Sequence, residues 1–309
     1  MLTLTADGPI TAPGLYLMDA DAYFSDPVPD GSLSSTWARK LMEPAGPAKF
    51  AHERRNPQPP KKVFDVGHAA HTIVLGSGSP IARIPEDKLA KNGAVSTTEA
   101  KEFCAEARAN GRTPLKPAEY DQVVAMAEAI KNHPEAMRVL AADGTQTEVS
   151  AFRRDPETGM WLRCRYDAIN PAGVGDLKTT TDADPAKFAR KTAAELGYFM
   201  QDAWYLDTAR ALDLTDGPLR FVLVEKTAPY LVSVVELSDV YLHIGRTRNR
   251  AAIDLYARCR EANYWPGYTG VTVVDPPNWL LNESDEQLAD DIAAELAAYA
   301  ESLKTGTAA

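Results

Sequence analysis

The chain has 309 residues, enough for one large domain or two modest ones, and its 45% hydrophobic and 25% charged residues are ordinary for a globular protein. No apolar run approaches the roughly 20 residues that span a bilayer, which excludes a membrane-spanning protein. The first residues show no basic region followed by an apolar one, so we expect no signal peptide. Three widely spaced cysteines exclude a disulfide framework and fit a reducing cytoplasm.

The first half of the chain is predicted to be mainly helical. Residues 1–30 are rich in Pro, Gly and Asp and are expected to be extended, with a short strand at 15–17. Ser and Thr residues at 34–36 provide N-cap chemistry for a helix that begins near Trp37. Three further helical patterns follow, at residues 64–75, 97–110 and 117–140.

The character of the sequence changes at Thr147, where strands become frequent. Strands are predicted at residues 148–154, 160–169, 174–179, 219–225 and 230–237. Helices are predicted at residues 184–191, 194–214, 239–263 and 283–303. This order predicts an α/β fold with a mixed central β-sheet flanked by helices. We expect a helical N-terminal part at residues 1–146 and a core at residues 147–309, together forming one compact domain.

The segment at residues 161–178 reads as a β-hairpin: its first arm covers 161–169, its turn is Asn-Pro-Ala-Gly at 170–173, and its second arm begins at Val174. In this register Asp167 lies opposite Asp176, and Lys178 points to the same face two residues later. Like charges across a strand pair are destabilising, so a compensating cation is expected. Carboxylate oxygens suit Mg²⁺ or Mn²⁺, which indicates a metal-dependent phosphodiesterase. The alternative interpretation is a solvated strand edge.

The net charge of −10 would oppose binding to a polyanion, but it is unevenly distributed. Residues 261–303 contain nine acidic residues and no Lys or Arg, whereas residues 36–62 hold seven Lys and Arg against two Glu. Two smaller basic clusters are Arg246, Arg248 and Arg250, and Lys187, Arg190 and Lys191. Because local patches govern phosphate contact, DNA remains a compatible partner. Ordinary solvated helix faces are the alternative for each cluster.

Taken together, these motifs resemble a known family. The arrangement Asp167…Asp176-Leu177-Lys178 resembles the signature of the PD-(D/E)XK nucleases. The wider sequence is similar to the nuclease domain of RecE (exonuclease VIII), and the stretches that carry the likeness are Leu33-Ser34-Ser35, Gly67-His68-Ala69-Ala70-His71, Arg165-Tyr166-Asp167, Asp176-Leu177-Lys178-Thr179-Thr180, and Tyr198-Phe199-Met200-Gln201 with Tyr205. The resemblance spans most of the chain and implies a restriction-endonuclease-like core.

The resemblance also implies roles for individual residues. Asp167 and Asp176 correspond to metal-binding carboxylates, and the backbone carbonyl of Leu177 to a further ligand. His71 corresponds to the helix histidine that completes the metal site, and Lys178 to the catalytic lysine. Small residues before His71 would let its helix approach the sheet closely, although a hydrogen-bonded histidine in a tightly packed helix is the plainer interpretation.

A stripe at i, i+3 and i+7 on the following helix contains Tyr198, Gln201 and Tyr205. Gln201 matches a family position and is expected to support the catalytic site, while the tyrosines are equally compatible with a core stripe. Glu148 begins its strand and is considered only as a residue behind the metal ligands. The residues expected to contact DNA are Arg165, Lys187, Arg190, Lys191, Tyr198 and Tyr205.

The activity that the resemblance implies is a Mg²⁺-dependent 5′→3′ exonuclease on double-stranded DNA ends, with Mn²⁺ as a substitute, leaving 3′ single-stranded tails for recombination. It further implies a homo-oligomer, a single-strand annealing (RecT-like) protein partner, and the cytoplasm of a bacterial host of a phage or prophage. Two alternatives stay open. One is a Cas4/RecB-like nuclease acting on single strands, which the scattered cysteines disfavour, and the other is a non-catalytic DNA-binding protein of the same fold.

Overall fold

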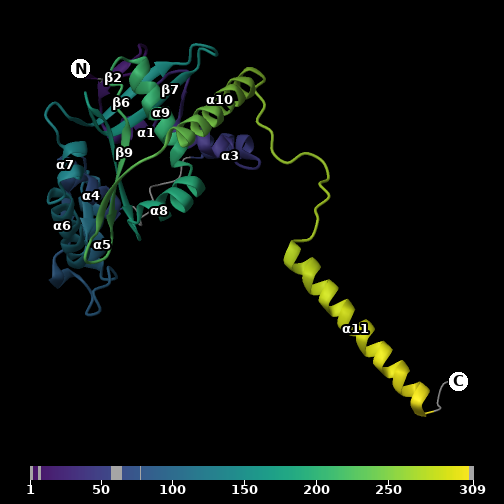
Figure 1. Ribbon diagram of the computed structural model, residues 1–309. Helices are drawn as coiled ribbons and strands as arrows, with labels where there is room; N and C mark the ends of the chain where they lie inside the picture. The colour runs from purple at the N-terminus through teal and green to yellow at the C-terminus, as the bar shows by residue number, and fades with distance from the viewer. Residues whose placement is uncertain (1–2, 6–7, 57–64, 77, 306–309) are drawn as a thin grey trace. The chain divides into compact units, whose positions relative to one another are not determined.

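The computed structural model describes residues 3–5, 8–56, 65–76 and 78–305. The chain divides into two compact units, Met1–Gly267 and Tyr268–Ala309. The first unit is a central sheet covered by helices, and it holds both the mainly helical stretch up to residue 146 and the strands that follow (Figure 1). The predicted mixed α/β class is therefore confirmed.

The strands of the first unit are β1 (Thr3–Thr5), β2 (Gly14–Leu17), β3 (Ser32–Ser34), β4 (Ile81–Arg83), β5 (Thr113–Leu115), β6 (Gln146–Arg154), β7 (Trp161–Asn170), β8 (Gly173–Thr180), β9 (Leu219–Glu225) and β10 (Val232–Glu236). Its helices are α1 (Ala20–Phe24), α2 (Ser35–Leu41), α3 (Gly46–Arg55), α4 (Asp65–Leu75), α5 (Thr98–Ala109), α6 (Pro117–Lys131), α7 (Pro134–Leu140), α8 (Pro185–Lys187), α9 (Tyr198–Ala211) and α10 (Asp239–Glu261), with a 3-10 turn η2 (Glu86–Lys88) and a π-helical turn η3 (Phe188–Ala193).

The main sheet has the order β1-β2-β6-β7-β8-β9-β10, and β3 pairs with one end of β7. Strands β6, β7 and β8 form an antiparallel meander, whereas β8 and β9 run parallel. The parallel pair needs a crossover connection, which α8, η3 and α9 provide. The sheet is mixed, as the sequence predicts.

Two layers of helices cover the sheet, and strand β9 contributes apolar side chains to the core beneath each layer. Phe221 and Leu223 belong to the apolar core that includes residues of α2, α9 and α10. Val222 and Val224, which alternate with them, belong to the core that includes residues of α4, α6 and α7. Because successive strand residues point to opposite faces, β9 is apolar on both sides and is buried between the two layers.

The hairpin that carries the Asp-Leu-Lys motif has the predicted register. Ala168 pairs with Gly175 and Ile169 with Val174. The strands run one pair further than expected, to Asn170 and Gly173, so the loop itself is shorter than predicted. Gly175 allows α7 to approach closely, since a Cβ atom there would lie 2.7 Å from Val139 Cγ1. The turn residues therefore fix which side chains stand opposite each other.

The structure corrects two of the predicted helices. The predicted helix at 117–140 is two helices, because Pro134 cannot continue the hydrogen-bonded ladder and begins α7. The predicted helix at 194–214 begins only at Tyr198, after Gly197 adopts a left-handed conformation (φ 65°). The π-helical turn η3 ends at Ala193, before the predicted start of this helix. Phe64, where α4 was expected to begin, and the basic residues Lys61 and Lys62 lie outside the described residues.

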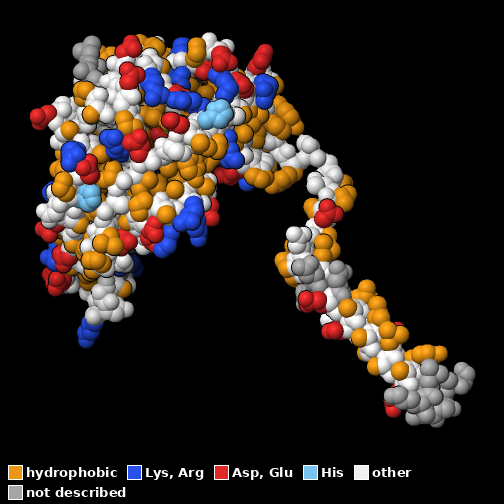
Figure 2. Space-filling view, viewed as in Figure 1, with side chains coloured by type: hydrophobic (Ala, Val, Ile, Leu, Met, Phe, Trp, Pro, Cys, Tyr) orange, Lys and Arg blue, Asp and Glu red, His pale blue; other side chains and the backbone are white. Residues whose placement is uncertain are grey.

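The second unit contains α11 (Asn278–Thr305), which begins five residues before the predicted start. Apolar side chains alternate with acidic ones along it (Figure 2). The exposed apolar residues Leu288, Ile292, Leu296 and Tyr299 recur at helical spacing on one stripe. Within the described part of the chain, no helix combines the length and the hydropathy that crossing a membrane requires.

Candidate metal centre

Three adjacent strands bring acidic residues into one row. The β6–β7 register pairs Thr147 with Ala168 and Val149 with Tyr166, which places Glu148 opposite Asp167. The β7–β8 pairing ends at Ala168–Gly175, and beyond it the Leu177 N–H donates to Asp167 Oδ2 at 2.8 Å, which brings the neighbouring Asp176 close to Asp167. The sheet thus gathers three carboxylates that repel one another unless positive charge lies among them.

Helix α4 supplies a histidine to this row. Ala69 and Ala70 have no exposed surface, so the helix packs closely on the sheet as its small residues predict. The Nε2 of His71 lies 2.9 Å from the backbone oxygen of Leu177. Its Nδ1 lies 3.6 Å from Asp167 Oδ2 and 3.9 Å from Glu148 Oε1. The Leu177 carbonyl therefore orients the imidazole, and the opposite ring nitrogen faces the carboxylates.

One ligand atom each from His71, Glu148 and Asp167 lies within 4.8 Å of the others. One imidazole nitrogen with two carboxylate oxygens is a donor set that suits Mn²⁺ and, with additional oxygens, Mg²⁺. Among the described residues, Asp176 is not part of this group. The donor set fits the expected divalent cation. Glu148 belongs to this donor set, whereas from the sequence it is expected only to support the ligands.

Glu148 has an unusual backbone conformation for a strand residue, with φ 55°. A non-glycine residue in this left-handed region is strained, and such strain persists only where surrounding contacts hold it. Arg165 supplies one of these contacts, because its Nε donates to Glu148 Oε2 at 2.8 Å. The strain aims the carboxylate at the cluster. The sequence could have placed Glu148 opposite Asp167, because pairing the two strands outward from the tight turn at 155–159 sets these two residues across from each other.

The pKa values reflect this crowding. Burial alone would lower the pKa of His71, but Asp167 and Glu148 outweigh it and raise the pKa to about 8. Burial raises the pKa of Asp167 to about 6, with nearby Asp176 adding to the rise. Burial would also raise the pKa of Glu148, but His71 and Arg165 bring it below its ordinary value. The imidazole is therefore held in its charged form, and a metal ion would displace that proton.

A second constellation adjoins the first and is centred on Asp176, which is 1% exposed. Lys178 Nζ lies 2.5 Å from its Oδ2, and Gln201 Nε2 donates to its Oδ1 at 2.5 Å. The Lys178 ammonium also lies 4.9 Å from the centre of the Tyr198 ring, a favourable cation–π arrangement. The predicted residues Asp176, Lys178 and Gln201 are thus brought together, next to the cluster of His71 and Asp167.

The residues expected to contact DNA are distributed differently. Arg165 is 12% exposed and binds Glu148, Ser150 and the Met18 carbonyl, so its charge is already engaged. Tyr205 packs edge-on against Tyr166. The exposed cations of the α8–η3 segment are Lys187, Arg190 and Lys191. Lys187 pairs with Asp182 at 2.6 Å. Their role in DNA binding stays a prediction.

A mixed sheet whose hairpin carries Asp167, Asp176 and Lys178 beside a histidine helix defines a domain of the PD-(D/E)XK type. Comparison with known families agrees, because residues 34–273 match a family described as a PDDEXK-like domain of unknown function (DUF3799). The match covers more than half of the chain. The chain belongs to this family, and its fold is that of the PD-(D/E)XK nucleases.

At least one solved structure shows the same fold. A candidate exonuclease from Eubacterium rectale aligns with a TM-score of 0.58 at 14% sequence identity, covering 84% of this chain and 96% of that one. An alkaline exonuclease from Laribacter hongkongensis aligns with a TM-score of 0.28 at 12% identity, covering 63% of this chain and 95% of that one. No curated protein matches the sequence. At this identity the first alignment supports the fold.

Proposed function

We propose that this protein is a divalent-metal-dependent deoxyribonuclease that degrades double-stranded DNA from its ends in the 5′→3′ direction. The observation that carries the proposal is the close group of His71, Glu148 and Asp167 beside the Lys178–Asp176 pair. Membership of the PDDEXK-like family supports hydrolysis of a phosphodiester. End preference and direction come from the resemblance to RecE nucleases.

His71, Glu148 and Asp167 would hold the metal. Asp176 and the Leu177 carbonyl, which the resemblance implies as further ligands, are bound here by Lys178 and Gln201 and by His71 Nε2, and would have to exchange these partners to join the site. When bound, Mg²⁺ or Mn²⁺ would supply Lewis acidity toward the scissile phosphate and a water of lowered pKa. The protein's own groups set the geometry of this site before substrate arrives, because Arg165 holds Glu148 and the Leu177 carbonyl holds His71.

Lys178 acts as an ammonium in this proposal. Burial would lower its pKa, but Asp176 and Asp167 outweigh burial and raise the pKa above the ordinary value of lysine. A protonated lysine orients water through its N–H groups and stabilises charge that develops on the phosphate, and it does not act as a general base. Gln201 fixes the Asp176 carboxylate on which Lys178 rests.

The biological setting proposed from the resemblance is recombination of phage or prophage DNA in the bacterial cytoplasm. A nuclease of this kind would leave 3′ single-stranded tails for a RecT-like annealing protein. The resemblance also implies a homo-oligomer. Size-exclusion chromatography with light scattering tests that part separately from the activity.

Digestion of linear duplex DNA labelled at either 5′ or 3′ ends, with Mg²⁺, Mn²⁺ or EDTA, tests the function. We expect metal-dependent release of the 5′ label first, and loss of cleavage in Asp167→Asn. Asp216→Asn is the control, since that carboxylate is 99% exposed in the loop after α9. Cleavage of single strands or closed circles only would contradict the end-specific duplex activity, and no cleavage with either metal would contradict the nuclease assignment.

A further inference from the structure

A pocket lies between the end of β6, α9 and α10, separate from the metal-binding cluster. Its lining includes three arginines, Arg153, Arg246 and Arg250, together with Asp155 and Asp207. Arg153 lies five residue steps along β6 from Glu148, a distance of about 17 Å at the rise of a β-strand. Nothing in the proposed chemistry accounts for this concentration of guanidinium groups.

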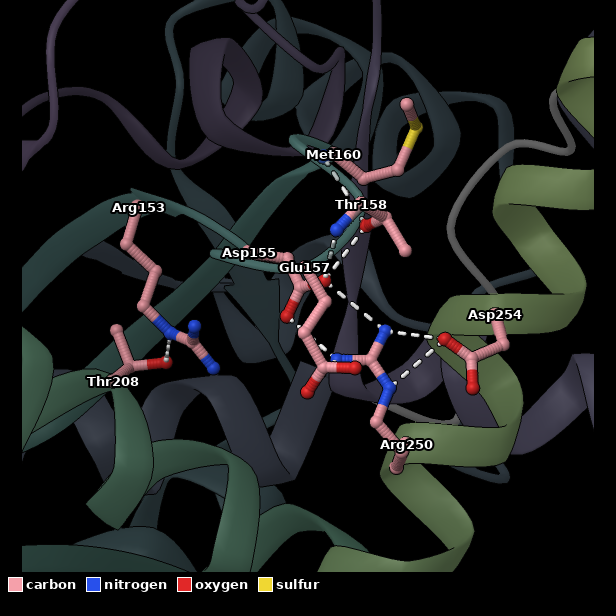
Figure 3. Close-up of polar contacts among 8 residues, drawn as sticks. All are labelled: Arg153, Asp155, Glu157, Thr158, Met160, Thr208, Arg250 and Asp254. Atoms are coloured by element: carbon pink, nitrogen blue, oxygen red, sulfur yellow. Dashed lines mark hydrogen bonds and ion pairs between the residues drawn. The ribbon is translucent and has the colours of Figure 1, made fainter.

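Each of the two acidic residues that line the pocket is ion-paired with one of its arginines. Arg250 makes paired hydrogen bonds to Asp155, at 2.9 and 3.0 Å, and also binds Asp254 on its own helix (Figure 3). Arg246 donates to Asp207 Oδ1 through Nε and Nη2, at 3.0 and 2.9 Å, and Arg210 Nη1 lies 3.7 Å from the same oxygen. Both carboxylates are thus paired with arginines other than Arg153.

In the described ranges of the chain Arg153 forms no ion pair, although Asp155 and Asp207 are near enough to act on its charge and oppose the effect of burial on its pKa. Its Nε donates to Thr208 Oγ1 at 3.2 Å, the single contact drawn for it in Figure 3. Among the described residues, neither Nη1 nor Nη2 has a hydrogen-bond or ion-pair partner, although the side chain is half-buried. Burial lowers the pKa of this guanidinium below its ordinary value. Neither Nη atom is among the buried polar atoms that lack a partner in the described residues, so both reach solvent and are open to a ligand.

A second polar atom in the pocket also lacks a partner. Asn249 is 5% exposed and uses its Nδ2 on the Met200 carbonyl. Its Oδ1 is buried and, within the part of the chain that the structure describes, accepts no hydrogen bond. A bound group that carries a hydroxyl, or brings a bridging water, would satisfy it.

We propose that this pocket binds a phosphate-type oxyanion through Nη1 and Nη2 of Arg153. The planar fork of a guanidinium matches two oxygens of a phosphate group. The ligand is either a phosphate of the DNA substrate or a free phosphate or mononucleotide. The DNA source rests on the proposed function and would place a backbone contact on the order of five nucleotide steps from the metal-binding cluster. The free source does not depend on that function.

The first test measures binding of labelled duplex DNA in EDTA by fluorescence anisotropy over a range of salt. Loss of one phosphate contact in Arg153→Gln is expected to lower the slope of log affinity against log salt by about one. Arg154→Gln is the matched control, because this neighbouring guanidinium binds the Gly159 carbonyl and lies over the Trp161 ring at 4.5 Å. Arg153→Lys keeps the charge and should retain the slope.

The second test measures the melting temperature in inorganic phosphate and in chloride at equal ionic strength. Stabilisation by phosphate in the wild type and in Arg154→Gln, but not in Arg153→Gln, would support the pocket with a free ligand. A changed salt slope would support the DNA source. If Arg153→Gln alters neither the slope nor the response to phosphate while remaining folded by circular dichroism, the pocket is not an anion site. Both tests work whether or not the protein cleaves DNA.

Discussion

Arg165 holds one oxygen of Glu148 while the other oxygen faces the histidine. Its Nε lies 2.8 Å from Glu148 Oε2, and Oε1 lies 3.9 Å from His71 Nδ1. Two further acceptors, Ser150 Oγ and the Met18 carbonyl, fix the guanidinium itself. The arginine that was expected to touch DNA is thus placed to orient a carboxylate of the cluster.

Glu148→Gln is expected to weaken metal binding, because it removes one negative charge from the donor set while keeping the shape of the side chain. We expect the affinity for Mn²⁺, measured by calorimetry without DNA, to fall at least about tenfold. Glu157→Gln is the control, since that side chain is 69% exposed on a turn. An unchanged affinity would leave Glu148 outside the metal site.

Arg165→Met should reduce both metal affinity and stability, because Glu148 would lose its donor in a largely buried place. The expected losses are about tenfold in Mn²⁺ affinity and roughly 1–3 kcal/mol in the free energy of unfolding. Arg165→Lys should restore part of the stability, but its single ammonium cannot reproduce the separate contacts that Nε and Nη1 make. If only the stability falls and the affinity for Mn²⁺ stays at the wild-type value, Arg165 does not position the carboxylate.

Lys178→Met is expected to lower the rate of single-turnover cleavage by about 10²–10³-fold, because the ammonium that faces the reacting phosphate is lost. Duplex binding in EDTA should change little, which separates this lysine from a general phosphate contact. Lys131→Met on α6 is an exposed control. A variant that binds DNA weakly but, once saturated, cleaves at the wild-type rate would contradict the role given to Lys178.

Asp202 should make stability depend on pH. Burial raises its pKa to about 8, aided by Glu236 and Asp176 and opposed by Arg246 and Arg210. The raised pKa favours the protonated form in the folded state, so this contribution to stability is complete near pH 4 and is lost as the pH rises toward 8. Asp202→Asn removes the ionisable group.

The free energy of unfolding of Asp202→Asn, relative to that of the wild type, should therefore increase between pH 4 and pH 8. We expect a rise on the order of a few kcal/mol, followed by a plateau. Chemical denaturation at several pH values measures this difference directly. A constant difference across the range would mean that Asp202 ionises normally in the folded protein.

The sequence was most informative where structure is local. The hairpin register followed from turn residues at 170–173 and the alternation around them, which is why Asp167, Asp176 and Lys178 could be placed. The position of His71 came from resemblance, because no local rule predicts that a helix 106 residues earlier meets Leu177. The pattern of small residues showed only that this helix packs closely.

Other features depended on contacts that no single segment contains. The left-handed backbone of Glu148 accompanies contacts of its side chain with Arg165 on β7 and His71 on α4, two elements far from it in the sequence. The split at Pro134, in contrast, could have been predicted from the sequence, since proline breaks a helix, but the prediction of one helix over 117–140 missed it.

The wide separation of His71 from its partners has a consequence for folding. Strands β6, β7 and β8 are neighbours in sequence and can pair early, whereas α4 must close a long loop to reach them. The carboxylates would then gather before the histidine arrives. A divalent ion bound at that stage would stabilise the contact between α4 and the sheet. Removing the ion with a chelator should therefore increase hydrogen exchange in α4 more than in the three strands.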